Sequence, residues 1–291
     1  MITIDKIKCI KTISDNAFSV NFLLLLKDKR IASCACAGTI RIYDPSNDYH
    51  CDQVIQRHWE PITSICELDD GTIVSCSCSG TIIIGDYAIK NAHEFEINKV
   101  IALPDNRIAS CSIDNTIKIW KSNPPYSDTP IKVLEGHSHW VNSLLYIKER
   151  DIMISGSNDD TLRLWNMSTY QCDKVIEGVR CCFTNSLYQI DKDRVIVGGF
   201  NSFSIVNIDK CVIENRINVK SIEYVYCFLK LRDNKTILCG CNGIFCFYDM
   251  NTKQYKITKN NHNDYISDLL FKDDNTFLSC SWDNTIKVWK Y

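Results

Sequence analysis

The chain lacks an excess of charge of either sign. Its 291 residues include 33 Lys and Arg against 35 Asp and Glu, a formal net charge of −2. General nucleic-acid binders and proteins of anionic membrane surfaces need an excess of basic side chains. The charge balance therefore argues against both classes.

Long apolar runs are also missing. No stretch of 18 apolar residues occurs, and the amino-terminal MITIDKIK has no hydrophobic region of the kind found in signal peptides. These absences predict a soluble intracellular protein without a membrane partner, placed in the cytoplasm, with the nucleus as the alternative.

Motifs of known catalytic chemistry are absent as well. The 11 glycines are scattered and form no phosphate-binding loop, and neither Gly-x-Ser-x-Gly nor His-Glu-x-x-His occurs. The acidic pairs Asp69-Asp70, Asp159-Asp160 and Asp273-Asp274 fall at predicted hairpin turns, where Asp is expected for backbone reasons. We therefore predict that the chain is not an enzyme, has no catalytic residues and needs no cofactor.

Cysteine is abundant, but its pattern does not indicate disulfides or a metal site. There are 17 cysteines, and Cys34, Cys76, Cys111 and Cys280 share one strand position that glycine fills in other copies of a repeat. A position that accepts Cys or Gly is a small buried slot, where a thiol acts as a small apolar group. The Cys-x-Cys pairs lack the two-residue ligand loops of zinc sites. This pattern predicts buried free thiols in a reducing compartment and no bound metal.

That repeat is clearest in residues 134–166. It contains Gly136-His137, then apolar residues at three-residue spacing, then a run from Thr161 to Trp165 that alternates apolar and polar side chains. Alternation of this kind is typical of a half-buried strand, and Asp159-Asp160 reads as the turn before it.

The repeat resembles the WD40 repeat, with Trp165-Asn166 where that family usually has Trp-Asp. Copies recur about every 41 residues, near the roughly 40–45 residues of a propeller blade. Their third strands begin at seven positions: Thr39, Thr81, Thr116, Thr161, about Ser202, Ile244 and Thr285. The resemblance implies an all-β, seven-bladed propeller of four-stranded antiparallel blades, with residues 1–291 as a single domain.

The chain ends directly after the seventh third strand, so the last blade lacks its outer strand. Residues from about 2 to 12 alternate well enough to form a strand. We predict that they complete the last blade and so close the ring, which removes free sheet edges.

The resemblance also implies a buried polar network in each intact blade. A histidine would bridge an aspartate and a serine, and the serine would accept the indole N–H of a tryptophan, so that every buried polar group has a partner. The residues in these positions are His93, Ser110, Asp114, Trp120, His137, Ser155, Asp159, Trp165, His262, Ser279, Asp283 and Trp289. His58, His93, His137 and His262 all stand four residues before an inner strand, which indicates a structural role.

Relatives of this kind commonly bind peptides on the narrow face where the loops leading into the inner strands meet the turns between the second and third strands. Carried onto this chain, those positions place aromatic and asparagine side chains mainly in blades four to seven. Such residues resemble a binding surface, although they could also fill space left by the missing networks of blades five and six. The predicted partner-binding residues are Trp140, Asn142, Asn158, Phe183, Asn185, Phe200, Tyr224, Tyr226, Tyr265 and Trp282.

The resulting hypothesis is a non-catalytic scaffold or adaptor that binds a peptide or partner surface as a monomeric propeller within a larger complex. Two alternatives remain open. One is a substrate-recognition or regulatory subunit of an enzyme complex such as a ubiquitin ligase. The other is an RNA-binding propeller, because aromatic side chains can stack on bases.

Overall fold

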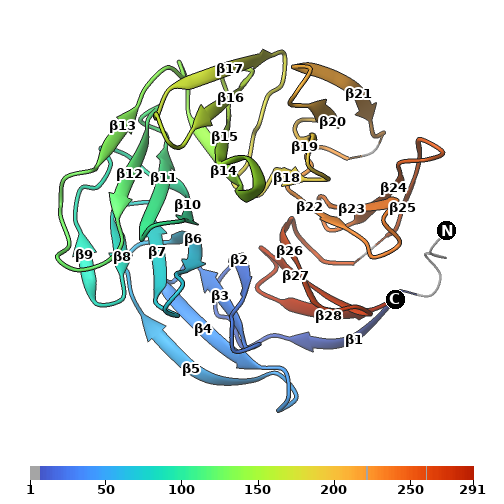
Figure 1. Ribbon diagram of the computed structural model, residues 1–291. Helices are drawn as coiled ribbons and strands as arrows, with labels where there is room; N and C mark the ends of the chain where they lie inside the picture. The colour runs from blue at the N-terminus through green and yellow to red at the C-terminus, as the bar shows by residue number, and fades with distance from the viewer. Residues whose placement is uncertain (1–6, 221, 260) are drawn as a thin grey trace.

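The computed structural model describes residues 7–220, 222–259 and 261–291. Seven four-stranded antiparallel sheets stand around a central channel like the blades of a propeller (Figure 1). In each blade the first strand lies innermost and the fourth outermost. The seven-bladed all-β propeller predicted from the repeat is confirmed.

The first three blades follow the chain in order. Blade one comprises β2 (Val20–Leu25), β3 (Ile31–Ala35), β4 (Thr39–Asp44) and β5 (His50–Gln56). Blade two comprises β6 (Ile62–Glu67), β7 (Ile73–Ser77), β8 (Ile82–Ile84) and β9 (Tyr87–Ile89). Blade three comprises β10 (Ile97–Leu103), β11 (Arg107–Ser112), β12 (Ile117–Lys121) and β13 (Lys132–Leu134).

The next three blades repeat the pattern. Blade four comprises β14 (Val141–Ile147), β15 (Ile152–Ser157), β16 (Thr161–Asn166) and β17 (Cys172–Glu177), with the short helix η2 (Lys148–Arg150) after β14. Blade five comprises β18 (Leu187–Gln189), β19 (Arg194–Gly198), β20 (Ser202–Asn207) and β21 (Val212–Asn218). Blade six comprises β22 (Cys227–Lys230), β23 (Thr236–Gly240), β24 (Phe245–Asp249) and β25 (Gln254–Ile257).

Blade seven joins the two ends of the chain. It comprises β26 (Ile266–Asp273), β27 (Thr276–Ser281) and β28 (Ile286–Lys290), and its outer strand is β1 (Lys8–Ile13) (Figure 1). The strands β1 and β28 pair antiparallel, from Lys8 opposite Lys290 to Ile13 opposite Ile286. Closure by the amino-terminal strand is thus confirmed for residues 8–13, and residues 2–6 of the predicted strand lie outside the described residues.

The apolar core lies between neighbouring blades. Val141 and Leu144 of blade four, for example, pack with Ile117 and Ile119 of blade three in one buried cluster. Each blade therefore buries its faces only against its neighbours, as in other stacked repeats. No helix among the described residues is long and apolar enough to cross a membrane.

The cysteines follow the predicted slots. All 17 are free thiols, and Cys34, Cys76, Cys111 and Cys280 are buried. The slot is small because residues of the neighbouring blade lie close to it. A Cβ atom added at Gly156, for example, would lie 2.5 Å from the sulfur of Cys181. Among the described residues, no three His, Cys, Asp or Glu side chains converge in a way that could hold a metal ion.

The polar network of blade four has the predicted hydrogen bonds. The indole N–H of Trp165 donates to Ser155 Oγ (2.8 Å), and that hydroxyl lies 2.7 Å from His137 Nε2. His137 Nδ1 lies 2.7 Å from Asp159 Oδ2. The same chain of contacts recurs from Trp120 to Asp114 in blade three and from Trp289 to Asp283 in blade seven.

The charges in this network are set by burial and hydrogen bonding. Burial lowers the pKa of His137, so the imidazole is neutral near neutral pH. Burial raises the pKa of Asp159, but hydrogen bonds from Thr161 and His137 outweigh it and hold that pKa below its ordinary value. The neutral ring can therefore donate from Nδ1 to a carboxylate and accept from Ser155 at Nε2.

Removing residues 1–13 is expected to lower the melting temperature by roughly 10 °C. The deletion leaves β28 as an unpaired edge and removes Ile13 from its cluster with Ile286 and Val288, a loss of about 3 kcal/mol or more. Calorimetry of the truncated chain measures the change. Ile10→Ala, at an exposed side chain of the same strand, is the control. An unchanged melting temperature in the truncated chain would refute closure by β1.

Replacing Asp159 by alanine is expected to cost about 1–3 kcal/mol of unfolding free energy, because it leaves the Nδ1–H of buried His137 without its acceptor. Asp159 also accepts from the backbone N–H groups of Ser138 and Thr161. Asp160→Ala is a matched control, since its carboxylate is half-exposed and pairs only with half-exposed Arg180. Equal losses in the two variants, measured by urea unfolding, would contradict the network.

Candidate functional site

One face of the propeller gathers the loops that lead into the inner strands and the turns between the second and third strands; we call it the top face. Backbone hydrogen bonds join these two kinds of segment in five blades, as in Asn158 N–H to Trp140 O (3.0 Å) and Trp282 N–H to Tyr265 O (3.1 Å). In blade five the turn at Phe200 instead pairs with Tyr224 of blade six. The positions carried over from the WD40 resemblance therefore do lie side by side.

Six of the predicted aromatic residues form a continuous cluster across blades five to seven. Neighbouring rings have centroids 4.0–5.9 Å apart, mostly edge-to-face, the separation at which aromatic pairs attract beyond simple burial. The members of this aromatic cluster are Phe183, Phe200, Tyr224, Tyr226, Tyr265 and Trp282.

Tyr226 is the hub of the cluster and is largely buried. Its side chain is only 5% exposed, and its ring contacts those of Phe183, Tyr265 and Trp282. Little of the Tyr226 side chain is therefore accessible to a partner, and a direct contact by this residue stays a prediction. Tyr226 supports the rings above it, of which Phe200 and Trp282 are exposed.

Trp140 stands apart from this cluster, across a hollow of about 490 Å³. Its indole packs against His139, and the far wall is made by Phe200 and Tyr224. Arg180 also lines the hollow, but its guanidinium pairs with Asp160 at 2.7 Å. The lining of the hollow is thus mainly aromatic, and the Arg180 guanidinium in it is already paired with Asp160.

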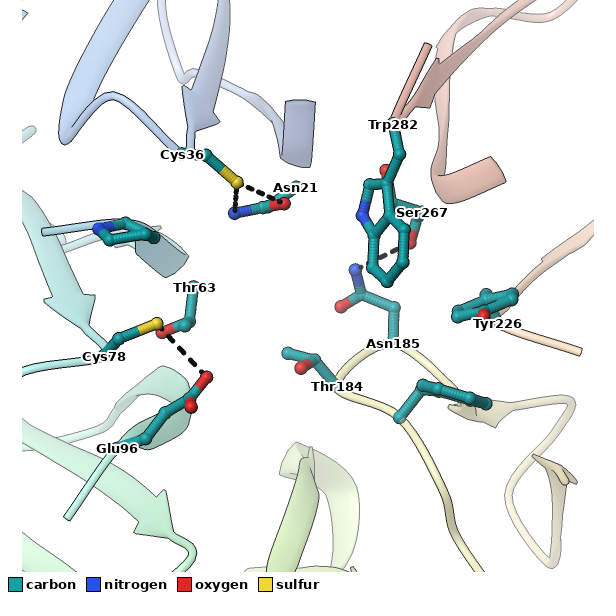
Figure 2. A pocket seen from close by; sticks show the side chains of 12 residues that line it. Asn21, Cys36, Thr63, Cys78, Glu96, Thr184, Asn185, Tyr226, Ser267 and Trp282 are labelled. Carbon is teal, nitrogen blue, oxygen red and sulfur yellow. Dashed lines mark hydrogen bonds between the residues drawn. The ribbon is translucent and has the colours of Figure 1, made fainter. Parts of the chain in front are cut away.

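The mouth of the central channel is a second hollow, of about 300 Å³ (Figure 2). Phe183, Tyr226 and Trp282 line one side, and smaller polar groups and thiols line the other. Glu96 is the only charged residue in this lining, and its carboxylate accepts a hydrogen bond from the Cys78 thiol (3.3 Å).

Two of the predicted asparagines, Asn142 and Asn185, form hydrogen bonds within the ring, and their contact with a partner stays a prediction. Asn142 is 5% exposed, and its amide donates to Cys181 O (2.7 Å) and to Asn158 Oδ1 (3.1 Å). The amide of Asn185 donates to Ser267 O in blade seven (3.2 Å, Figure 2). The side-chain amides of both predicted contact residues are therefore held by hydrogen bonds within the ring.

This arrangement is a general feature of the ring. In six blades the residue at this inner-strand position donates from its side chain to a backbone carbonyl of another blade, five of them to the next blade. The bonds run from Asn21 to Ile62, Thr63 to Ile97, Asn98 to Val141, Asn142 to Cys181, Asn185 to Ser267 and Ser267 to Val20. Tyr226 occupies the position in blade six. We call these bonds the inter-blade staples.

The sequence analysis missed three exposed aromatic residues in blades one to three. Trp59 is 96% exposed, and Phe18 and Phe95 are each more than half exposed. All three lie within three residues before an inner strand. Phe18 and Phe95 are one position, and Trp59 two positions, away from those carried over from the family pattern. Exposed aromatic side chains are therefore present near the inner strands of blades one to three as well as on the top face of blades four to seven.

Two buried charged groups lie below the mouth, on the channel wall. The Lys99 ammonium donates to Thr184 O (3.0 Å) and Asn185 Oδ1 (3.3 Å), and burial lowers its pKa. Asp268 accepts from the backbone N–H groups of Leu23 (3.0 Å) and Leu269 (2.9 Å). Burial nevertheless raises the pKa of Asp268 to about 7.

Asp268 should make the protein less stable as pH rises from 5 to 8. Its pKa is about 7 in the folded chain and near 3.8 when unfolded, so only the unfolded chain is fully ionised between these values. The expected loss is roughly 2–3 kcal/mol relative to Asp268→Asn, whose side chain does not titrate. Denaturant unfolding of both chains at several pH values measures it. A stability difference that is constant with pH would contradict the raised pKa.

Comparison with known proteins agrees with the repeat. The family model described as "WD domain, G-beta repeat" matches residues 87–121, 128–166 and 253–290. These segments contain most of blades three, four and seven, the blades with complete His–Asp networks.

Curated relatives are similar over parts of the chain. The nuclear distribution protein nudF of Aspergillus niger is 34% identical over 100 residues, which are 34% of this chain and 22% of the relative. The nuclear distribution protein PAC1 of Candida glabrata is 28% identical over 212 residues, covering 58% of this chain and 44% of the relative. A WD repeat-containing protein 89 homolog of Dictyostelium discoideum is 24% identical over 152 residues, covering 52% and 41%.

The chain thus spans less than half the length of each of these relatives. The comparisons nevertheless show three WD40 repeats in this chain, and the structure places them in a β-propeller of seven four-stranded blades.

Proposed function

We propose that this chain, as one propeller domain over residues 1–291, is a non-catalytic scaffold that binds a protein partner on its top face. The observation that carries the proposal is the exposed aromatic surface there. Rigid aromatic side chains bury much area at low entropic cost, and they are enriched at the energetic centres of protein interfaces. Trp140, Phe200 and Trp282 are each at least 40% exposed, and each lies within two residues of a strand.

The histidines support a non-catalytic role. His93, His137 and His262 each use both ring nitrogens within a blade, and the buried His58 contacts Ser75 (2.8 Å). A general base needs a nitrogen within reach of a substrate proton. These four rings are instead held inside the fold.

The matched relatives are consistent with the proposal without specifying a partner. Two are named nuclear distribution proteins and one a WD repeat-containing protein, and each is similar over only part of its length. The 17 free thiols support a reducing location such as the cytoplasm.

The triple variant Trp140→Ala/Phe200→Ala/Trp282→Ala is expected to lose protein partners captured from cell extract by the native chain. All three side chains are exposed, so the fold should persist, while removal of aromatic anchors should weaken binding at least about 10-fold. Quantitative capture with a tagged chain measures the loss.

The matched control is Val54→Ala/Val175→Ala/Val212→Ala, which removes three similarly exposed apolar side chains from the outer strands β5, β17 and β21. Circular dichroism and melting of both variants establish that each is folded. If the aromatic variant keeps every partner of the native chain, the top face is not the binding surface.

A further inference from the structure

The loop residues that lead into the inner strands share an unusual composition. In five blades we take the three residues that directly precede the inner strand, and in blades five and six the corresponding loop residues, which are separated from β18 by three residues and from β22 by two. We call these 21 positions the inner collar; they are residues 17–19, 59–61, 94–96, 138–140, 181–183, 222–224 and 263–265. Three of them, Pro61, Glu96 and Phe183, line the mouth of the central channel. Each segment contributes one Phe, Trp or Tyr: Phe18, Trp59, Phe95, Trp140, Phe183, Tyr224 and Tyr265.

The inner collar is also acidic. It contains the five carboxylates Glu60, Glu94, Glu96, Glu223 and Asp264 and no Lys or Arg. Four of the five are exposed, and Glu96 is half-buried at the channel mouth. A surface that combines aromatic faces with carboxylates attracts cations in two ways. The ring quadrupoles attract them through cation–π interactions, and the carboxylates attract them through opposite charge.

These carboxylates have no cationic partner in the described part of the chain. The contacts they do make come from neutral donors: the Cys78 thiol to Glu96 (3.3 Å), the Tyr265 hydroxyl to Glu223 (3.4 Å) and the Tyr265 backbone N–H to Asp264 (2.7 Å). Elsewhere on the protein, exposed carboxylates commonly pair, as Asp86 does with Arg57 and Asp160 with Arg180.

Arg180, which lines the hollow beside Trp140, is paired with Asp160, and the other basic residues of these loops follow the outer strands. Lys90 directly follows the outer strand β9, and Lys220 and Lys259 follow β21 and β25 by two residues. Lys99, deeper in the channel, is already held by Thr184 and Asn185. The charge on the top face therefore changes from mixed at the rim to purely acidic at the inner collar.

From this geometry we infer that the inner collar recognises a basic segment of a partner protein, with its Lys or Arg side chains lying between the aromatic rings and the carboxylates. This inference rests on the proposed function and adds the chemistry of the ligand. An acidic segment or an RNA strand would bring negative charge against five unpaired carboxylates and would be repelled.

The test uses two synthetic peptides of equal length, one repeating Gly-Arg-Ser-Lys and one repeating Gly-Glu-Ser-Asp. Tryptophan fluorescence titration should show binding of the basic peptide only. Its affinity should fall steeply between about 20 mM and about 300 mM salt, because exposed charges are screened.

The variant Glu60→Gln/Glu94→Gln/Glu96→Gln should weaken binding of the basic peptide by roughly 10-fold, since exposed ion pairs contribute a few-fold each. The matched control, Asp52→Asn/Asp69→Asn/Glu149→Gln, changes the net charge equally at exposed carboxylates on β5, the turn before β7 and η2. It should bind as the native chain does. Equal binding of both peptides, or equal losses in the two variants, would overturn the inference.

The same variants in the partner-capture experiment separate the two proposals. Partners lost from the exposed-aromatic variant and from the Gln variant support both. Partners lost only from the aromatic variant overturn the basic ligand and leave the top-face scaffold intact. Partners retained by the aromatic variant overturn the scaffold proposal itself.

Discussion

The propeller depends on the antiparallel pairing of β1 with β28, because this is the contact that turns a row of blades into a ring. Each blade buries its faces only against its two neighbours. In an open row, blade seven would lack its outer strand and both terminal blades would expose an apolar face. Closure places Ile13 and Ile286 in the same cluster as Val20 and Leu23 of blade one, so the two ends of the chain share one core.

The blades of the closed ring differ in the interactions that stabilise their interiors. Blades three, four and seven keep the complete polar network, and the family model matches most of each. Blades five and six have no such histidine, and large rings fill their cores instead. Phe203 packs edge-to-face on Phe228 and Tyr248, and Phe245 packs on Phe277 and Trp289. The aromatic cluster on the top face lies directly beside these blades, where packing has replaced hydrogen bonding.

Neighbouring sequence positions on the top face have different roles. Residues just before an inner strand project outward and carry the aromatic and acidic side chains. The residue one place into the strand faces its neighbours and forms an inter-blade staple, as Asn142 does in β14. In blade five Asn185, two residues before β18, forms the staple. This division explains why aromatic residues so close to the channel can stay exposed: the ring beneath them is held together by other side chains.

Spacing and composition in the sequence were enough to determine the propeller, its seven blades, the closing strand and the His–Asp–Ser–Trp contacts, since these depend on a repeat visible along the chain. The tertiary structure alone decided which top-face side chains are exposed. Asn142 and Tyr226 were predicted to lie on the top face, yet both are buried because neighbouring blades supply carbonyls and rings that their own blade does not encode. The exposure of Trp59 was likewise invisible in the repeat, because Trp59 lies two positions from the family pattern and its environment is set by the loops of two blades. Contacts within a blade follow from the local sequence. Contacts between blades depend on residues about 40 positions apart, which only the fold brings together.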